Sequence, residues 1–199
     1  MTNTGFSAET VAQVQSLNQA FIGELYAAAQ AQRVAVEPTL ITALSTARHE
    51  RHSSLRQCPF LLFRIEIGHC GVNEPSGVWL GAHHDSTATL ICAALTFIWQ
   101  LAKTDIAAAR LVSGAPISWI EDLAQRQLAE LVGFAKASHL RPRLIDVPGY
   151  WHDLLRRSGI SALQRASLGA AGLQMCLSRS RLNRQPRNLP TLSRALPDQ

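Results

Sequence analysis

Arginine is the residue whose number and placement in this chain point most directly to chemistry. Residues 141–199 hold ten arginines and three aspartates, a net charge of +7, whereas residues 1–140 hold nine Lys or Arg and eleven Asp or Glu, a net charge of −2. A guanidinium group offers a rigid fork of N–H donors that fits phosphate. A basic end on a near-neutral body is typical of a protein that binds a polyanion, usually nucleic acid. A solubilising tail is the alternative.

We expect the phosphate contacts to come from arginines that follow the central helices and from the C-terminal tail. The candidate DNA-binding residues are Arg141, Arg143, Arg156, Arg157, Arg179, Arg181, Arg184 and Arg187. Each contact with a phosphate releases counterions, so binding through these side chains weakens as salt rises.

Histidines and cysteines raise the hypothesis of a metal site. His49 and His52 are three residues apart, and a second group surrounds a Gly-rich stretch, at His69, Cys70, His83, His84 and Asp85. Structural zinc sites take four ligands, commonly in paired spacing. The sequence contains no Cys-x-x-Cys pair and no His-Glu-x-x-His. We therefore expect a polar loop here, without metal or cofactor, and keep a metal-dependent enzyme as a competing hypothesis.

Other catalytic patterns are missing from the sequence. It has no Gly-x-Ser-x-Gly elbow, no Gly-rich phosphate loop and no dinucleotide fingerprint. Glu121 and Asp122 are adjacent carboxylates, but neighbouring positions on a helix point apart, so shared acid–base work is not expected. We predict that the protein is not an enzyme.

The elements that would position these residues are mainly helices. Apolar residues at helical spacing predict amphipathic helices over residues 7–33 and 87–103, and Glu37-Pro38 opens another helix between them. Residues 48–57 are polar and fit a helix, residues 60–67 are the best strand candidate, and residues 68–86 have the composition of a loop.

Residues 104–144 predict three short helices and then an extended basic segment. Asp105 can cap the first helix and Gly114 can end it in the left-handed conformation. The apolar sides of the second and third helices would be formed by Ile117, Ile120 and Leu123, and by Leu128, Leu131, Val132 and Ala135. This arrangement is compatible with a helix-turn-helix. The acidic Glu121 and Asp122 would lie on its recognition helix, which opposes contact with phosphates.

We therefore predict an all-α, multi-helix bundle with two helical halves, each ending in a short extended segment. The expected domains are 1–68, a linker at 69–86, a second half at 87–158, and a C-terminal helix with a flexible basic tail at 159–199. Shifting the first half by 79 positions places Leu44 on Leu123 and Arg64 on Arg143. A degenerate duplication and a chance agreement of apolar periodicity both explain this echo. Trp99, Trp119 and Trp151 fit either a core or an interface.

The expected location is the cytoplasm. The first ten residues are polar and unlike a signal peptide, and the apolar stretch from Ala88 to Trp99 is too short to span a bilayer. We therefore predict no membrane contact.

The segment from Asp105 to Leu144 resembles FlhD, the helical subunit of the flagellar master transcriptional activator. The resemblance lies in an ordered, ungapped series: Asp105, Ala109, Gly114, Leu123, Leu128, Leu131, Phe134-Ala135 and Leu140. The helix at Leu95 to Ala102 fits the leading helix of that family. The resemblance covers about 50 residues, a quarter of the chain. The chain is nearly twice as long as a typical member, and Pro142 lies where the family's intersubunit cysteine would fall.

The resemblance implies an all-helical DNA-binding activator subunit that forms dimers and works with an FlhC-like partner carrying the zinc cysteines. Long FlhD-like proteins also resemble regulators of integrative and conjugative elements, which switch on transfer genes. Two FlhD-like halves would suit a single-chain version of the dimer. A helical protein–protein adaptor that does not touch DNA is the alternative function.

Overall fold

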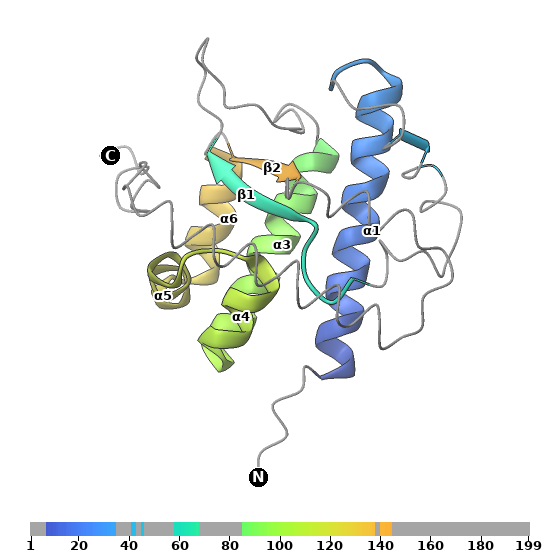
Figure 1. Cartoon of the computed structure of the whole chain (residues 1–199). Coiled ribbons are helices and arrows are strands. Elements are labelled where there is room, and N and C mark those ends of the chain that lie inside the picture. Colours follow the sequence, from blue (N-terminus) through green and yellow to red (C-terminus); the bar gives the residue numbers. More distant parts are fainter. Residues whose placement is uncertain are drawn as a thin grey trace.

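The computed structural model describes residues 7–34, 58–67, 85–137 and 140–144, together with the single positions 41, 42 and 45. These residues are mainly helical, as predicted. The helices are α1 (Ala8–Gln30), α3 (Asp85–Thr104), α4 (Ile106–Ser113), α5 (Ile117–Gln125) and α6 (Leu128–Ala137) (Figure 1). Two strands, β1 (Phe63–Ile67) and β2 (Leu140–Leu144), pair as an antiparallel ribbon. The predicted helix at Glu37-Pro38, the polar piece at 48–57, and residues 145–199 lie almost entirely outside this description.

Helix α1 begins where the sequence predicts, because Ser7 caps it. The Ser7 Oγ accepts a hydrogen bond from the Thr10 amide at 3.0 Å, which satisfies one of the free donors of the first turn. Its buried face carries Phe21, whose ring stacks on Phe63 of β1 with the centroids 4.6 Å apart. Burial of an aromatic side chain of this size stabilises the fold by about 1.5–3 kcal/mol. This contact anchors β1 on α1.

One polar side chain, Asn18, lies inside this apolar face. It is fully buried, and it donates to the carbonyl oxygen of Phe60 at 2.8 Å and accepts from the amide of Leu62 at 2.9 Å. The amide between them, Leu61 N, donates to the carbonyl of Val112 on α4. Residues 60–62 therefore bond to two helices instead of to a neighbouring strand. This explains why β1 begins at Phe63 and not at Phe60, where the sequence pattern placed the start of the strand.

Helix α3 is the centre of the fold. It contacts α1, α4, α5, α6 and β2, and in Figure 1 α1 lies on one side of it while the three short helices lie on the other. The chain directions of α1 and α3 are roughly opposite, and the Ser86 hydroxyl on α3 donates to the Glu24 carboxylate on α1 at 2.8 Å. Helix packing from several sides requires apolar residues around most of the helix.

The same apolar character makes α3 long and apolar enough to pass a test for membrane spans. Within α3, residues 86–104 are long and apolar enough to cross a membrane by length and composition, with 44% of that window buried in the fold. The uninterrupted apolar run from Ala88 to Trp99 is shorter than this window. The contacts of α3 with five other elements give a physical reason for its composition that needs no lipid.

The short helix α4 begins and ends at the residues that the sequence indicates. The Asp105 carboxylate accepts from the Ala108 amide at 2.9 Å, and Gly114 ends α4 with φ of 64°, in the left-handed region. Two predictions about the inward faces of α5 and α6 are wrong. Ile117 and Leu128, the first residues of α5 and α6, are 48% and 44% exposed, whereas Ile120, Leu123 and Leu131 are buried. First-turn side chains extend beyond the neighbours that cover the rest of each helix.

Candidate nucleic-acid interface

The β1–β2 ribbon has one apolar face and one charged face. Its register pairs Phe63 with Leu144, Arg64 with Arg143, Ile65 with Pro142, Glu66 with Arg141, and Ile67 with Leu140. Side chains alternate between the two faces of a strand. Leu140, Pro142 and Leu144 are accordingly buried against the core, and Arg141 and Arg143 are partly exposed. The other face therefore gathers three arginines and one glutamate, which are Arg64, Arg141, Arg143 and Glu66.

This charged face, formed by Arg64, Glu66, Arg141 and Arg143, has more positive than negative charge. Glu66 forms an ion pair with Arg143, with 3.4 Å between Oε2 and Nη1, and the two side chains are 30% and 22% exposed. Arg64 lies directly opposite Arg143, and like charges in such a pair repel. A face that holds a repulsive pair of cations gains free energy when an anion binds to it.

Arg64 is the member of this face that makes no hydrogen bond or ion pair among the described residues. Its Nε is buried without a hydrogen-bond partner. Its guanidinium lies beside Gly114, so that a Cβ added to that glycine would lie 3.6 Å from Nε. A partly buried guanidinium without an acceptor is costly, because burial removes water that it would otherwise bind. Such a group is a natural receptor for an external anion.

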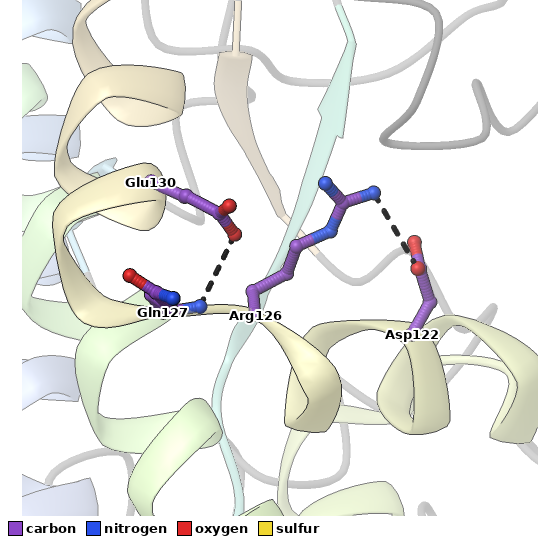
Figure 2. Close-up of polar contacts among 4 residues, drawn as sticks. All are labelled: Asp122, Arg126, Gln127 and Glu130. Atoms are coloured by element: carbon purple, nitrogen blue, oxygen red, sulfur yellow. Dashed lines mark hydrogen bonds and ion pairs between the residues drawn. The ribbon is translucent and has the colours of Figure 1, made fainter.

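The helix-turn-helix interpretation places the reading surface elsewhere, on α5. Its exposed positions are Ile117, Ser118, Glu121 and Gln125, and none of them is basic. The remaining charge on this helix is Asp122, which pairs with Arg126 at 3.6 Å, as Figure 2 shows. Phosphates would be repelled by this surface. The described part of the chain therefore favours the ribbon over α5 as the face for a polyanion.

The polar residues around the α5–α6 turn have structural roles. The Gln127 amide donates to the Glu130 carboxylate at 3.1 Å, half of a capping box at the start of α6 (Figure 2). The Trp99 indole donates to the Arg126 carbonyl at 2.9 Å, and Lys103 lies 5.6 Å from the centre of its ring. Trp99 therefore belongs to the packing of α3 against the end of α5. This is the core alternative of the two that the sequence left open for Trp99.

The structure describes two of the eight predicted DNA-binding residues. Arg141 and Arg143 lie on one face of β2. The other six, which lie outside the described residues, are Arg156, Arg157, Arg179, Arg181, Arg184 and Arg187. The prediction missed Arg64, which β1 brings onto the same face. Two signals pointed to it: the alternation from Arg64 to Ile67, and its alignment with Arg143 in the internal echo.

The metal hypothesis falls mostly on residues that the structure does not describe. His49, His52, His69, Cys70, His83 and His84 are among them, and only the backbone of Asp85 is described. Within the described ranges, no group of three His, Cys, Asp or Glu side chains has the geometry to hold a metal ion.

The segment that resembles FlhD forms α4, α5, α6 and β2, and so supplies one strand of the charged ribbon. Its Asp105 and Gly114 have the cap and left-handed turn expected of them. Comparisons of the chain with models of known protein families, with curated proteins and with solved structures found no match. Membership of the FlhD family therefore stays a prediction.

Proposed function

We propose that this protein is a DNA-binding subunit of a transcriptional activator, FlhD-like, that acts with an FlhC-like partner to switch on transfer genes of a mobile element or flagellar genes. The resemblance from Asp105 to Leu144 supplies the family. The net charge of +7 on residues 141–199 supports a polyanionic ligand. The proposal assigns no catalytic residue, metal or cofactor to the chain, and places it in the cytoplasm.

The observation that carries this proposal is the charged face of the ribbon. Arginines from two distant parts of the chain, Arg64 on β1 and Arg141 and Arg143 on β2, share that face with one carboxylate. Guanidinium groups bind phosphate oxygens by charge-assisted hydrogen bonds, which are about twice as strong as neutral ones. An antiparallel two-stranded ribbon is also narrow enough to enter the major groove of DNA.

We further propose that the chain consists of two related halves. Helices α1 and α3 begin at residues 8 and 85, and the strands occupy residues 63–67 and 140–144, so that each of these bounds lies 77 positions from its counterpart. The same offset matches buried with buried residues in the helices: Val14 with Ile91, Phe21 with Ile98, and Leu25 with Ala102. The offset of 79 that the sequence echo used does not align the strands. Two related halves in one chain favour a monomer over the homodimer that the resemblance allows.

A gel-shift titration tests the proposed function. The full chain, alone and with an FlhC-like protein from a neighbouring reading frame, is titrated onto promoter DNA from the same locus at low and at moderate salt. We expect a shifted complex whose affinity falls as salt rises. Absence of any complex at low salt, with the partner present, would overturn the proposal.

The exposed first residues of the short helices favour a second candidate, an adaptor that binds protein and not DNA. Ile106, Ile117 and Leu128 are 37%, 48% and 44% exposed. A contiguous exposed apolar patch marks a protein interaction site, and the adaptor function requires these three side chains to contribute to one. The adaptor hypothesis predicts that deletion of residues 178–199 changes neither the function of the protein nor the copurification of nucleic acid with it. Substitution of Ile117 and Leu128 by Ser would then abolish partner binding, whereas the DNA-binding function predicts retained DNA affinity in that variant.

A further inference from the structure

The two ends of the charged face differ, because its arginines are not equally occupied. The register sets Arg141 opposite Glu66, whereas Arg64 lies opposite Arg143. Arg143 pairs with Glu66, and Arg141 has an interaction partner as well. Arg64 makes no hydrogen bond or ion pair within the described part of the chain. Among these three arginines, Arg64 is therefore the one whose donors are available to an external anion.

The guanidinium of Arg64 is held in place at the end of α4. Its Nε is buried, and a Cβ added to Gly114 would lie 3.6 Å from Nε and 3.8 Å from Nη2. Gly114 ends α4, so the cation lies at the negative end of that helix. The helix end stabilises this charge, yet in the described ranges Arg64 donates to none of its carbonyl groups. A guanidinium that is already oriented loses little side-chain entropy when an anion binds.

A second cation lies across the ribbon from Arg64. Residues directly opposite on antiparallel strands have Cβ atoms about 4.5–5.5 Å apart, so Arg143 is within reach of the same anion. Its ion pair with Glu66 has 3.4 Å between nitrogen and oxygen, longer than the roughly 2.7–2.9 Å of a strong charge-assisted bond. Both side chains are also partly exposed to water, which weakens the pair further. An anion beside Arg64 can therefore draw Arg143 away from Glu66 at little cost.

We infer that Arg64 is the primary contact of the ribbon with DNA and holds one backbone phosphate, with Arg143 as the second donor once it leaves Glu66. The inference rests on the proposed function and adds the residue, the number of phosphates and the role of Glu66 as a competitor. A phosphodiester group has two unesterified oxygens, and each can accept from one guanidinium. Binding also relieves the repulsion between the two facing arginines. Arg141, which already has a partner, contributes less.

Fluorescence anisotropy of a labelled duplex of mixed sequence, titrated with the full chain over a series of salt concentrations, tests this inference. The variants are Arg64→Gln, Arg143→Gln, Glu66→Gln and the double variant that combines the last two. Arg141→Gln is the matched comparison, because it removes an arginine that has a partner from the same face. Lys103→Gln is the control for net charge, since Lys103 is exposed in the last turn of α3, outside the ribbon. Circular dichroism and thermal midpoints establish that each variant is folded.

We expect Arg64→Gln to weaken duplex binding about tenfold and to lower the slope of log affinity against log salt by about 0.9, the value for one phosphate contact. A second duplex of unrelated sequence should show the same loss, because a phosphate contact does not read bases. Arg64→Lys keeps the charge but not the fork of donors, so it should restore the slope and only part of the affinity. Arg141→Gln should weaken binding less than Arg64→Gln, and Lys103→Gln least.

The competition for Arg143 gives a second readout. In the presence of Glu66, part of the gain from the phosphate contact is lost in breaking the ion pair, so Arg143→Gln should weaken binding only about threefold. In the Glu66→Gln background Arg143 is released from the carboxylate, and the same substitution should weaken binding about tenfold. This dependence on the background separates an exchange of partners from a role of the ion pair in folding.

Four results would overturn the inference. They are an unchanged salt slope in Arg64→Gln, a loss in Arg141→Gln or Lys103→Gln as large as that in Arg64→Gln, a loss that differs between the two duplexes, and an equal effect of Arg143→Gln with and without Glu66.

Two other outcomes would give Arg64 a different role and overturn the inference as well. A lower thermal midpoint of Arg64→Gln with unchanged DNA affinity would show that Arg64 only stabilises the end of α4. Weaker binding of the FlhC-like partner with unchanged DNA affinity would show that the face serves a protein. In all these cases the proposed function stands as long as the wild type binds DNA. Failure of the wild type to bind any DNA, alone or with the partner, overturns the function and the inference together.

Discussion

Replacement of Asn18 by Ala is the sharpest test of how the ribbon is held in place. Asn18 is fully buried on α1 and bonds to the backbone of the segment that leads into β1, through the Phe60 carbonyl at 2.8 Å and the Leu62 amide at 2.9 Å. A third contact, to the Cys58 carbonyl at 3.4 Å, is long and contributes little. The variant therefore removes the Asn18 hydrogen bond from one buried acceptor and from one buried donor.

The size of the loss follows from these two bonds. A buried polar group deprived of its partner costs about 1–3 kcal/mol. For two such groups we expect a loss of about 2–6 kcal/mol in the free energy of unfolding, a large part of the 5–15 kcal/mol typical of a domain. In a chain of this length that loss corresponds to a fall of roughly 4–24 °C in the thermal midpoint.

Urea denaturation followed by circular dichroism measures this loss, with Gln19→Ala as the control. Gln19 is the exposed neighbour on the same helix, and its replacement should change stability by less than about 0.5 kcal/mol. Hydrogen exchange of the Leu62 amide adds a local measurement, since that amide should exchange much faster in Asn18→Ala. Equal stability of Asn18→Ala and Gln19→Ala would refute the proposed docking of residues 60–62 on α1.

Asn18→Asp separates the donor from the acceptor. The carboxylate can still accept from the Leu62 amide but cannot donate to the Phe60 carbonyl, and it places a buried negative charge beside that oxygen. We expect a loss at least as large as that of Asn18→Ala at neutral pH. A protonated carboxyl group donates again, so the gap from the wild type should narrow as the pH is lowered. A gap that widens would contradict the assigned hydrogen bonds.

Three further predictions concern the backbone and the charged face. Gly114→Ala introduces a side chain at φ of 64° and should lower the free energy of unfolding by about 1–2 kcal/mol in urea denaturation, whereas an unchanged value would mean that the turn relaxes. Gln32→Gly, at the non-glycine residue with φ of 53°, should raise it by about 0.5–1 kcal/mol, and a loss would contradict a strained helix end. Glu66→Gln removes the carboxylate from the ribbon face and should strengthen DNA binding several-fold in the anisotropy assay; weaker binding would show that the ion pair with Arg143 orients the site.

The proposed relation between the two halves suggests a reason why Asn18 is polar. Its counterpart at the offset of 77 is Leu95, which is also buried. In the second half, the residues that correspond to 58–60 are 135–137, at the end of α6, where a helix satisfies its own backbone. In the first of these halves residues 58–62 have no regular structure, so their backbone groups take partners from elsewhere: Asn18 for Phe60 and Leu62, and the Val112 carbonyl for the Leu61 amide. At Leu95 an apolar side chain suffices because the corresponding segment is helical. At Asn18 a side-chain amide is needed because residues 58–62 are not helical.

The sequence by itself determined the local structure of this protein. Ser7, Asp105 and Gly114 mark helix ends by hydrogen bonds and backbone conformations that involve only residues nearby in the chain. Apolar residues at helical spacing also located the long helices, because this spacing involves only residues nearby in the chain. It could not determine how far the first turns of α5 and α6 extend past their neighbours, so the predicted burial of Ile117 and Leu128 was wrong.

Only the tertiary structure decided which distant residues meet. Arg64 and Arg141 are separated by 76 intervening positions, and the register of the ribbon brings them onto one face. The sequence echo pointed to an offset of 79 because helical periodicity repeats every three or four residues, so offsets that differ slightly fit almost equally well. Strand pairing is discrete, and a slip of one residue moves every side chain to the other face. The ladder therefore selects one register, and with it the arginines that form the charged face.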